Sequence, residues 1–130
     1  MPTYDAIRFT PPAPLALVAF RNTVTGVRLA DVPMLLDSGA DVTLVPRQAI
    51  LRLGVSIDPA AVYELMGFDG NRSSAQAVHL DLVFLRRTFR GRFLLLDHEC
   101  GILGRDILNH LSLFLDGPRL NWDERASPVK

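Results

Sequence analysis

Residues 34–41 read MLLDSGAD, an apolar run that delivers one acidic side chain, Asp37, into a Ser-Gly turn. The motif occurs only once in the chain. Leu35 and Leu36 give the turn apolar surroundings, where a lone charged carboxylate is costly. Gly39 has no side chain, so another main chain can approach the turn closely. We therefore expect Asp37 to carry the chemistry of this chain.

Length, composition and net charge limit the number of domains and the partners that we expect. The chain has 130 residues, of which 48% are hydrophobic, enough for one domain with a real core. Fourteen basic and fourteen acidic residues balance to a formal charge of zero. Without net positive charge there is no general electrostatic attraction to nucleic acid or to a membrane, and we expect neither as a partner.

The expected location is cytoplasmic and the expected state is soluble. The longest apolar run has about eight residues and contains Pro14, too short to cross a bilayer or to form a signal core. The only cysteine, Cys100, cannot form a disulfide within the chain, in agreement with a reducing compartment.

Three regions are expected along the chain. Residues 1–14 hold four prolines and little periodicity, which indicates an extended arm outside the core. Residues 15–122 form the expected domain, and residues 123–130 an expected frayed tail.

Short β-type runs dominate that domain and alternate with turn signals. We expect strands at 16–20, 27–29, 32–36, 62–66, 75–85, 93–96, 113–115 and 120–122, with a tight turn at Arg90-Gly91. A helix over 47–53 should end at Gly54, and a second helical stretch is expected over 105–111. The pattern predicts a small, mainly antiparallel β barrel with one or two short helices.

A second apolar motif, Ile102-Leu103-Gly104, is followed by Arg105 and Asp106. Together with Leu36 to Ala40, this element resembles the active-site turn and the later hydrophobic-hydrophobic-glycine element of the retropepsin-like aspartic proteases. The resemblance covers roughly residues 16–122. It implies an all-β fold, a small closed antiparallel barrel of the acid-protease type. The spacing of the two motifs suits one lobe and is too short for the two-lobed pepsin form.

What the resemblance implies about activity follows from the single copy of the motif. Hydrolysis in this family uses two carboxylates that share one proton, so two copies of the chain would pair as a homodimer and contribute one Asp37 each. One carboxylate takes a proton from a bound water that attacks the peptide carbonyl, and the other donates a proton to the carbonyl oxygen. The substrate would be a peptide or protein, with no metal or other cofactor, and the optimum would be acidic to mildly acidic.

The family pattern also implies supporting roles around the turn. The Ser38 hydroxyl would bond backbone across the dimer axis, and Ala40 would keep the floor of the cleft narrow. Asp41 and Arg105 would form a bidentate ion pair that braces the loop; the alternative is two unrelated solvated charges. Arg21 loosely resembles an arginine that some relatives send across the dimer to the same acid.

A glycine-containing hairpin is the candidate for the flap that covers the cleft in this family and binds substrate. Its residues are Met66, Gly67, Phe68, Asp69 and Gly70. Asp-Gly is a strong hairpin-turn signal in its own right, so a surface hairpin without a catalytic role is the alternative. This tip lacks the several adjacent glycines of viral relatives.

Other polar clusters have plainer interpretations. His98 and Cys100 do not have a usual zinc-ligand spacing, so a polar loop is favoured over a metal site or a Cys-His pair. His79 and His110 lie in apolar stretches, which favours structural roles over ligation. A local cluster of arginines favours a solvated hairpin face over nucleic-acid binding; its members are Arg86, Arg87, Arg90 and Arg92.

A second class of function remains open. The same fold could serve as a non-proteolytic dimerisation or peptide-binding module. The intact Asp37, Ser38 and Gly39 favour catalysis, because a module that only binds has no chemical need for the acid.

Overall fold

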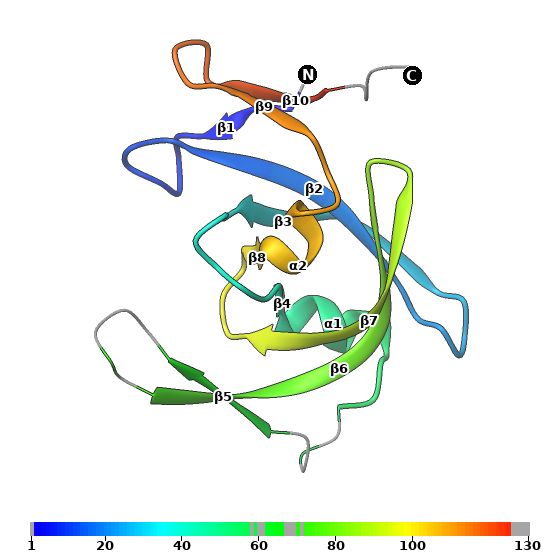
Figure 1. The fold of residues 1–130 in the computed structure, drawn as a ribbon. Coiled ribbons are helices and arrows are strands. Elements are labelled where there is room, and N and C mark those ends of the chain that lie inside the picture. The colour runs from blue at the N-terminus through cyan, green and yellow to red at the C-terminus, as the bar shows by residue number, and fades with distance from the viewer. Residues whose placement is uncertain (1, 58, 60–61, 67–69, 71, 126–130) are drawn as a thin grey trace.

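The structure is a computed structural model that describes residues 2–57, 59, 62–66, 70 and 72–125 (Figure 1). Strands dominate it, and two short helices complete it. The elements are β1 (Tyr4–Asp5), β2 (Ala13–Arg21), β3 (Arg28–Leu36), β4 (Leu44–Pro46), α1 (Arg47–Leu53), β5 (Val62–Met66), β6 (Arg72–Phe84), β7 (Arg87–Leu96), β8 (Gly101–Leu103), α2 (Arg105–Leu108), β9 (Leu113–Asp116) and β10 (Asn121–Glu124).

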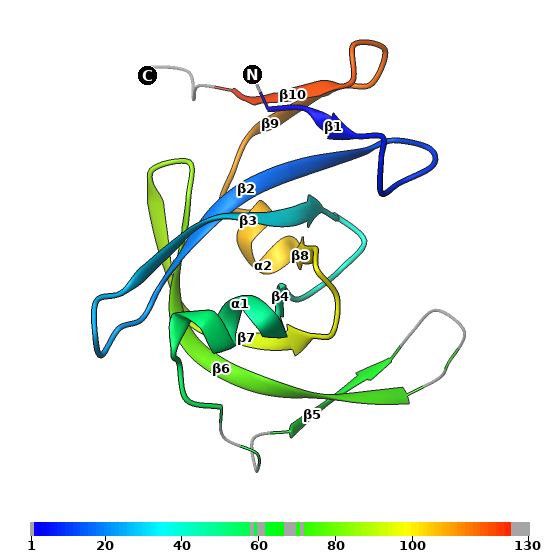
Figure 2. The ribbon, with the colours of Figure 1, turned by 180° about the vertical axis from the view of Figure 1, so that it is seen from behind.

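Eight of these strands form one curved sheet in the order β1-β2-β3-β8-β4-β7-β6-β5, and β2 also pairs with β6. The all-β class expected from the sequence is confirmed. The barrel is not strictly closed, however, and two of its pairings, β3 with β8 and β4 with β7, are parallel. Figures 1 and 2 show both helices in the hollow of the curved sheet.

The core fills the space between the sheet and the two helices. Alternation explains its composition, because every second side chain of a strand points to the concave face. The side chains buried to less than 2% exposure include Val18, Phe20, Met34, Val45, Ile50, Val78, Leu80, Leu82, Leu103, Ile107 and Trp122.

Helix α1 matches its expected bounds. It buries Ala49, Ile50 and Leu53 and leaves Leu51 exposed, as expected for a short amphipathic helix. Gly54 ends it with a φ of 77°, a left-handed conformation that glycine adopts without a steric penalty. The second helix is shorter than expected, because from His110 onwards the backbone hydrogen bonds connect residues three apart rather than four.

The prediction of a tight turn at Arg90-Gly91 is wrong. Both residues lie inside β7, which pairs with β6 from Phe84↔Arg87 onwards. The chain reverses instead at Leu85 and Arg86, whose φ angles of 52° and 63° make a two-residue hairpin loop. A glycine is tolerated within β7, opposite Leu80, because strand pairing rather than local propensity decides this position.

Both ends of the described chain are paired within the same molecule. Tyr4 and Asp5 pair with Pro14 and Ala13 of β2, and Thr3 forms a bridge with Asn121. The hairpin of β9 and β10 extends to Glu124 and so includes the first two residues of the expected tail. Among the described residues, none belongs to a helix that combines the length and the apolar character needed to span a membrane.

The junction of β2, β6 and β7 contains a buried carboxylate. Asp81 is 2% exposed, and its two oxygens accept hydrogen bonds from Arg90 at 2.9 and 3.2 Å. Arg21 Nη1 lies 3.4 Å from the same carboxylate. The arginine considered above for a contact across a dimer is therefore engaged within its own chain.

Replacing Asp81 with Asn is expected to lower the free energy of unfolding by about 1–2 kcal/mol at pH 7, because charge-assisted hydrogen bonds are lost. Arg90, and after it Arg21, hold the pKa of the Asp81 carboxyl below its usual value. A lowered folded-state pKa stabilises the protein above the unfolded-state pKa of about 3.9, and this contribution disappears as the pH falls through the folded-state value.

Urea unfolding of wild type and variant at pH 7 and at about pH 2.5 measures this effect. The deficit of Asp81→Asn should shrink at the lower pH, whereas Asp31→Asn, at an exposed position, should show almost none at either. A deficit equal at both pH values would exclude the charge of Asp81 as its source.

Candidate active site

The acid turn is a hydrogen-bonded loop at the end of β3. Asp37 follows the last residue of the strand, is half-buried, and donates its backbone N–H to Leu103 O at 3.0 Å. Its Oδ1 accepts the N–H of Gly39 at 3.0 Å, and its backbone carbonyl accepts the N–H of Ala40 at 3.2 Å. A Cβ at Gly39 would lie 3.1 Å from that Oδ1, so glycine leaves room for the carboxylate.

The second apolar motif lies directly beside this turn. Its strand, β8, runs parallel to β3 with Leu35↔Ile102 and Leu36↔Leu103 in register. The same strand pairs antiparallel with β4 at Leu44↔Ile102. Since β8 is thus inserted between β3 and β4, the fold brings together two motifs that are far apart in the sequence.

Gly104 is required at the point where β8 meets the β3–β4 loop. A Cβ there would lie 2.5 Å from Val42 O and 3.0 Å from Ala40 O. Such a contact is too short for any side chain, so only glycine fits without a shift of the backbone. The next residue fixes the loop from the same place, because Arg105 donates its backbone N–H to Ala40 O at 2.8 Å.

The expected ion pair between Asp41 and Arg105 does not form in this chain. Arg105 Nη1 instead donates to the backbone carbonyl of Ser38 at 2.7 Å. Both Asp41 and Arg105 are exposed, and a surface ion pair offers little free energy to compete with a hydrogen bond to a fixed carbonyl. Arg105 therefore stabilises the acid turn by hydrogen bonds to the backbone carbonyls of Ser38 and Ala40, and not by an ion pair with Asp41.

Sequence reasoning missed Thr43, the buried residue that ties this region together. Thr43 is 1% exposed. Its hydroxyl donates to Asp106 Oδ1 at 2.6 Å and accepts the N–H of Gly104 at 3.0 Å. Its backbone N–H donates to Asp106 Oδ2 at 3.1 Å. The available signal was a lone polar residue between Val42 and Leu44, because a buried hydroxyl requires a partner.

The expected flap corresponds to a β-hairpin. Strands β5 and β6 pair antiparallel up to Met66↔Arg72, which confirms a hairpin at this position. Gly67, Phe68 and Asp69 lie outside the described residues. Gly70 has a φ of 81°, the left-handed conformation typical of a turn glycine.

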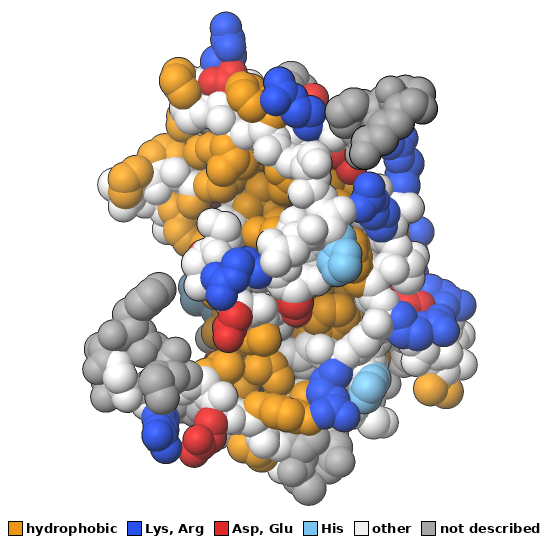
Figure 3. All heavy atoms as spheres, viewed as in Figure 1, with side chains coloured by type: hydrophobic (Ala, Val, Ile, Leu, Met, Phe, Trp, Pro, Cys, Tyr) orange, Lys and Arg blue, Asp and Glu red, His pale blue; other side chains and the backbone are white. Residues whose placement is uncertain are grey.

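The acid turn lies at the edge of a hollow. Figure 1 shows the β3–β4 loop on the same side of the molecule as the β1–β2 loop, which lies above it. Figure 3 shows this side recessed beneath the β1–β2 loop, with hydrophobic side chains in the recess.

The cluster at His98 and Cys100 is a local loop. His98 Nδ1 accepts the N–H of Cys100 at 3.1 Å, and Cys100 is 3% exposed. Burial raises the pKa of the Cys100 thiol, which disfavours a reactive thiolate. The described part of the chain gathers no three His, Cys, Asp or Glu side chains in a geometry that could hold a metal ion.

Comparisons with known proteins give a structural likeness only. No family model matches the chain, and no curated protein matches it. Among solved structures it is similar to a retroviral protease, the EIAV protease complexed with the inhibitor HBY-793, with a TM-score of 0.58 and 24% sequence identity. The match covers 75% of this chain and 86% of that chain.

The chain has a retropepsin-like fold. At 24% identity the likeness concerns the path of the backbone and not its chemistry. Within the retropepsin-like fold, any functional assignment depends on the residues at the acid turn.

Proposed function

We propose that this protein is an aspartic endopeptidase that acts as a homodimer, with one Asp37 from each copy at a shared active site. The observation that supports it best is the setting of Asp37. Its half-buried carboxylate accepts the N–H of Gly39, and its backbone N–H donates to Leu103 O of the neighbouring strand β8. Binding alone would not require an acid there.

The requirement for a second copy follows from the number of carboxylates. Activation of water by this chemistry needs two acids that hold one proton between them. Of the nearby acids, Asp106 is bound to Thr43 and Asp41 is exposed at the surface of the loop. The second carboxylate is therefore the partner subunit's Asp37, brought in by a two-fold axis next to the acid turn.

The proposed reaction is the attack of a water on a peptide carbonyl. The ionised Asp37 accepts a proton from the water as its oxygen bonds to the carbonyl carbon, and the protonated partner donates to the carbonyl oxygen. Collapse of the tetrahedral intermediate then breaks the C–N bond: the first Asp37 gives the proton it took from water to the departing amine nitrogen, and the hydroxyl formed from the carbonyl oxygen returns its proton to the partner subunit's Asp37 as the carboxylic acid forms. An extended peptide that lies between the acid turn and the β5–β6 hairpin is the proposed substrate.

A peptide library incubated with the protein over a pH series tests the proposal, with products identified by mass spectrometry and the size of the protein measured in parallel. We expect new peptide termini and an acidic to mildly acidic optimum, because only intermediate pH values leave one proton on the pair. A dimer that cuts nothing at any pH would contradict the proposal and support the peptide-binding module instead.

A further inference from the structure

The loop between β1 and β2, residues 6–12, exposes apolar side chains to solvent. Its sequence is AIRFTPP, in which five of the seven residues are apolar. Ile7 is 97% exposed, more than any other large hydrophobic side chain in the described part of the chain, and Phe9 is only half-buried. Apolar surface gathered on one exposed loop is typical of a contact surface for another molecule.

Hydrogen bonds within the chain fix the shape of this loop. Asp5 Oδ1 accepts the backbone N–H groups of Ile7 at 2.8 Å and Arg8 at 3.0 Å. Arg8 is the only charged residue of the loop, and its side chain binds the carboxylates of Asp5 and, at 2.7 Å, of Glu99. Because the loop is ordered and its charge is paired, a partner that packs on it pays little to order it.

The loop lies on the side of the molecule that carries the proposed catalytic acid. Figure 1 shows it above the β3–β4 loop, which contains Asp37, and Figure 3 shows hydrophobic side chains on it and in the recess beneath it. Leu35, two residues before Asp37, is half-buried, whereas its neighbour Met34 is 0% exposed in the core. Since successive side chains of a strand alternate, Leu35 points away from the core and adds apolar surface beside the acid turn.

The N-terminal strand itself offers no free edge to a second copy. On one side β1 pairs with β2. On the other side Thr3 forms a bridge with Asn121, and Tyr4 donates its backbone N–H to Leu120 O at 2.9 Å. A contact with another chain in this region must therefore come from side chains, of which Ile7 is the most exposed.

We propose that the β1–β2 loop is a contact surface for a second copy of this chain, with Ile7 of each copy packed against apolar surface beside the acid turn of the other. The inference rests on the proposed function, because a two-fold axis next to Asp37 brings this side of one copy against the same side of the other. A two-fold contact requires one self-complementary surface. An apolar projection and an apolar recess on the same side of the molecule meet that requirement (Figure 3).

Sedimentation velocity over a range of protein concentrations tests the proposal. Ile7→Asp should raise the dissociation constant of the dimer by at least about 100-fold, because the substitution acts once in each copy and each burial is worth about tenfold. Ile7→Leu keeps an apolar group of the same size and should raise it by less than about tenfold. Ile7 is exposed in the single chain, so both variants should fold, and the fluorescence of the buried Trp122 checks this.

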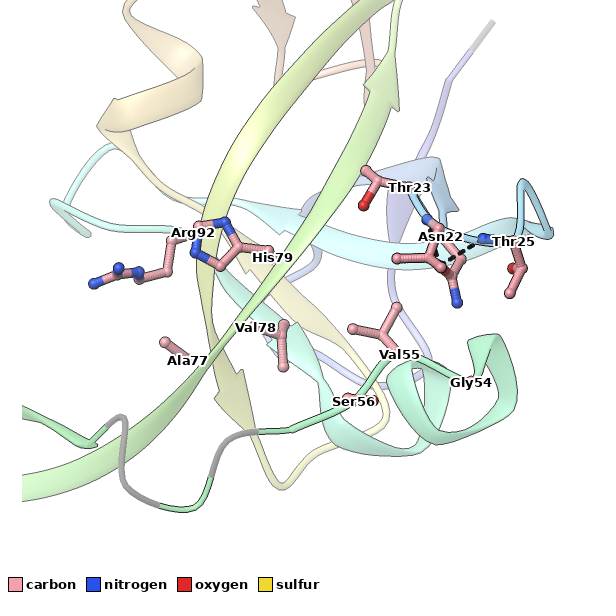
Figure 4. A pocket seen from close by; sticks show the side chains of 11 residues that line it. Asn22, Thr23, Thr25, Gly54, Val55, Ser56, Ala77, Val78, His79 and Arg92 are labelled. Atoms are coloured by element: carbon pink, nitrogen blue, oxygen red, sulfur yellow. Dashed lines mark hydrogen bonds between the residues drawn. The ribbon is translucent and has the colours of Figure 1, made fainter.

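Val24→Asp is the matched control. Val24 is 92% exposed, and its N–H donates to the side chain two residues before it, Asn22 Oδ1 at 2.9 Å, as the N–H of Ile7 donates to Asp5. Its β2–β3 loop lies on the opposite side of the molecule from the acid turn (Figures 1 and 2). Figure 4 shows this loop at a separate pocket, where Asn22 faces Val55. The dissociation constant should remain that of wild type.

The outcomes separate this inference from the proposed function. A wild-type protein that dimerises while Ile7→Asp dimerises equally well would overturn the role of the loop and leave the shared active site intact. A wild type that stays monomeric at every concentration would overturn both. An equal effect of Val24→Asp would show that any added charge weakens the dimer and would also overturn the role of the loop.

Peptide cleavage distinguishes a contact between copies from a contact with substrate. The specific activity of Ile7→Asp should rise towards the wild-type value as its concentration passes the raised dissociation constant, with an unchanged KM for the peptide. A normal dimer with a raised KM would mean that the loop contacts substrate and would refute the proposal.

Discussion

Replacement of Asp37 with Asn is expected to reduce peptide hydrolysis by at least about 10³-fold, because general acid-base catalysis is lost at both positions of the shared site. Asparagine is nearly isosteric, and its amide oxygen can still accept the N–H of Gly39 that Asp37 Oδ1 accepts at 3.0 Å. The turn should therefore keep its shape. Initial rates on a peptide identified as a substrate, with the unfolding temperature measured alongside, give the comparison.

Asp31→Asn is the matched control for this experiment. It makes the same chemical change in β3, the strand that leads to Asp37, at an exposed position whose φ of 59° asparagine tolerates. We expect its activity to remain within about twofold of wild type, as for surface substitutions with little effect on stability. If Asp37→Asn cleaved the same peptide as fast as Asp31→Asn, the proposed role of Asp37 would be wrong.

Replacement of Thr43 with Val should cause a large loss of stability close to the acid turn. Valine has almost the shape of threonine but cannot donate to Asp106 or accept the buried N–H of Gly104. Loss of a hydrogen bond to a charged group and an unsatisfied N–H together cost about 2–4 kcal/mol. Because Gly104 adjoins the acid turn, catalytic activity should fall as well.

Urea unfolding of Thr43→Val and Thr43→Ser measures this contribution. Serine keeps the hydroxyl and loses only a methyl group, so its deficit should stay near 1 kcal/mol. A double-mutant cycle with Asp106→Asn should show that the two residues are coupled. Equal stability of the valine and serine variants would mean that the hydroxyl makes no net contribution.

The acid turn and the motif of β8 could be predicted because each is a short local pattern. An apolar run that ends at Asp37, a following glycine and a later Ile-Leu-Gly run are visible in the chain without knowledge of its contacts. The helix over 47–53 was equally local, since its apolar spacing and Gly54 define both ends.

Features that depend on pairing between distant segments could not be predicted in the same way. Thr43 meets Asp106 only because β8 is inserted between β3 and β4. The hairpin loop at Leu85 and Arg86 has no glycine to mark it, whereas Gly91, which resembles a turn residue, is held in β7 by its register with Leu80. The Arg105 side chain donates to the backbone carbonyl of Ser38 and not to Asp41, the acid expected from the sequence. Only the geometry of the loop shows which of the two it contacts.

The dependence of activity on two copies of the acid can be measured by mixing chains. Wild type and Asp37→Asn are combined in equal amounts, allowed to exchange subunits, and assayed at the total concentration of a wild-type control. If only dimers with two Asp37 side chains cleave peptides, random pairing leaves about one quarter of the control activity. A remaining activity of about one half would mean that each chain works alone and would contradict the shared active site.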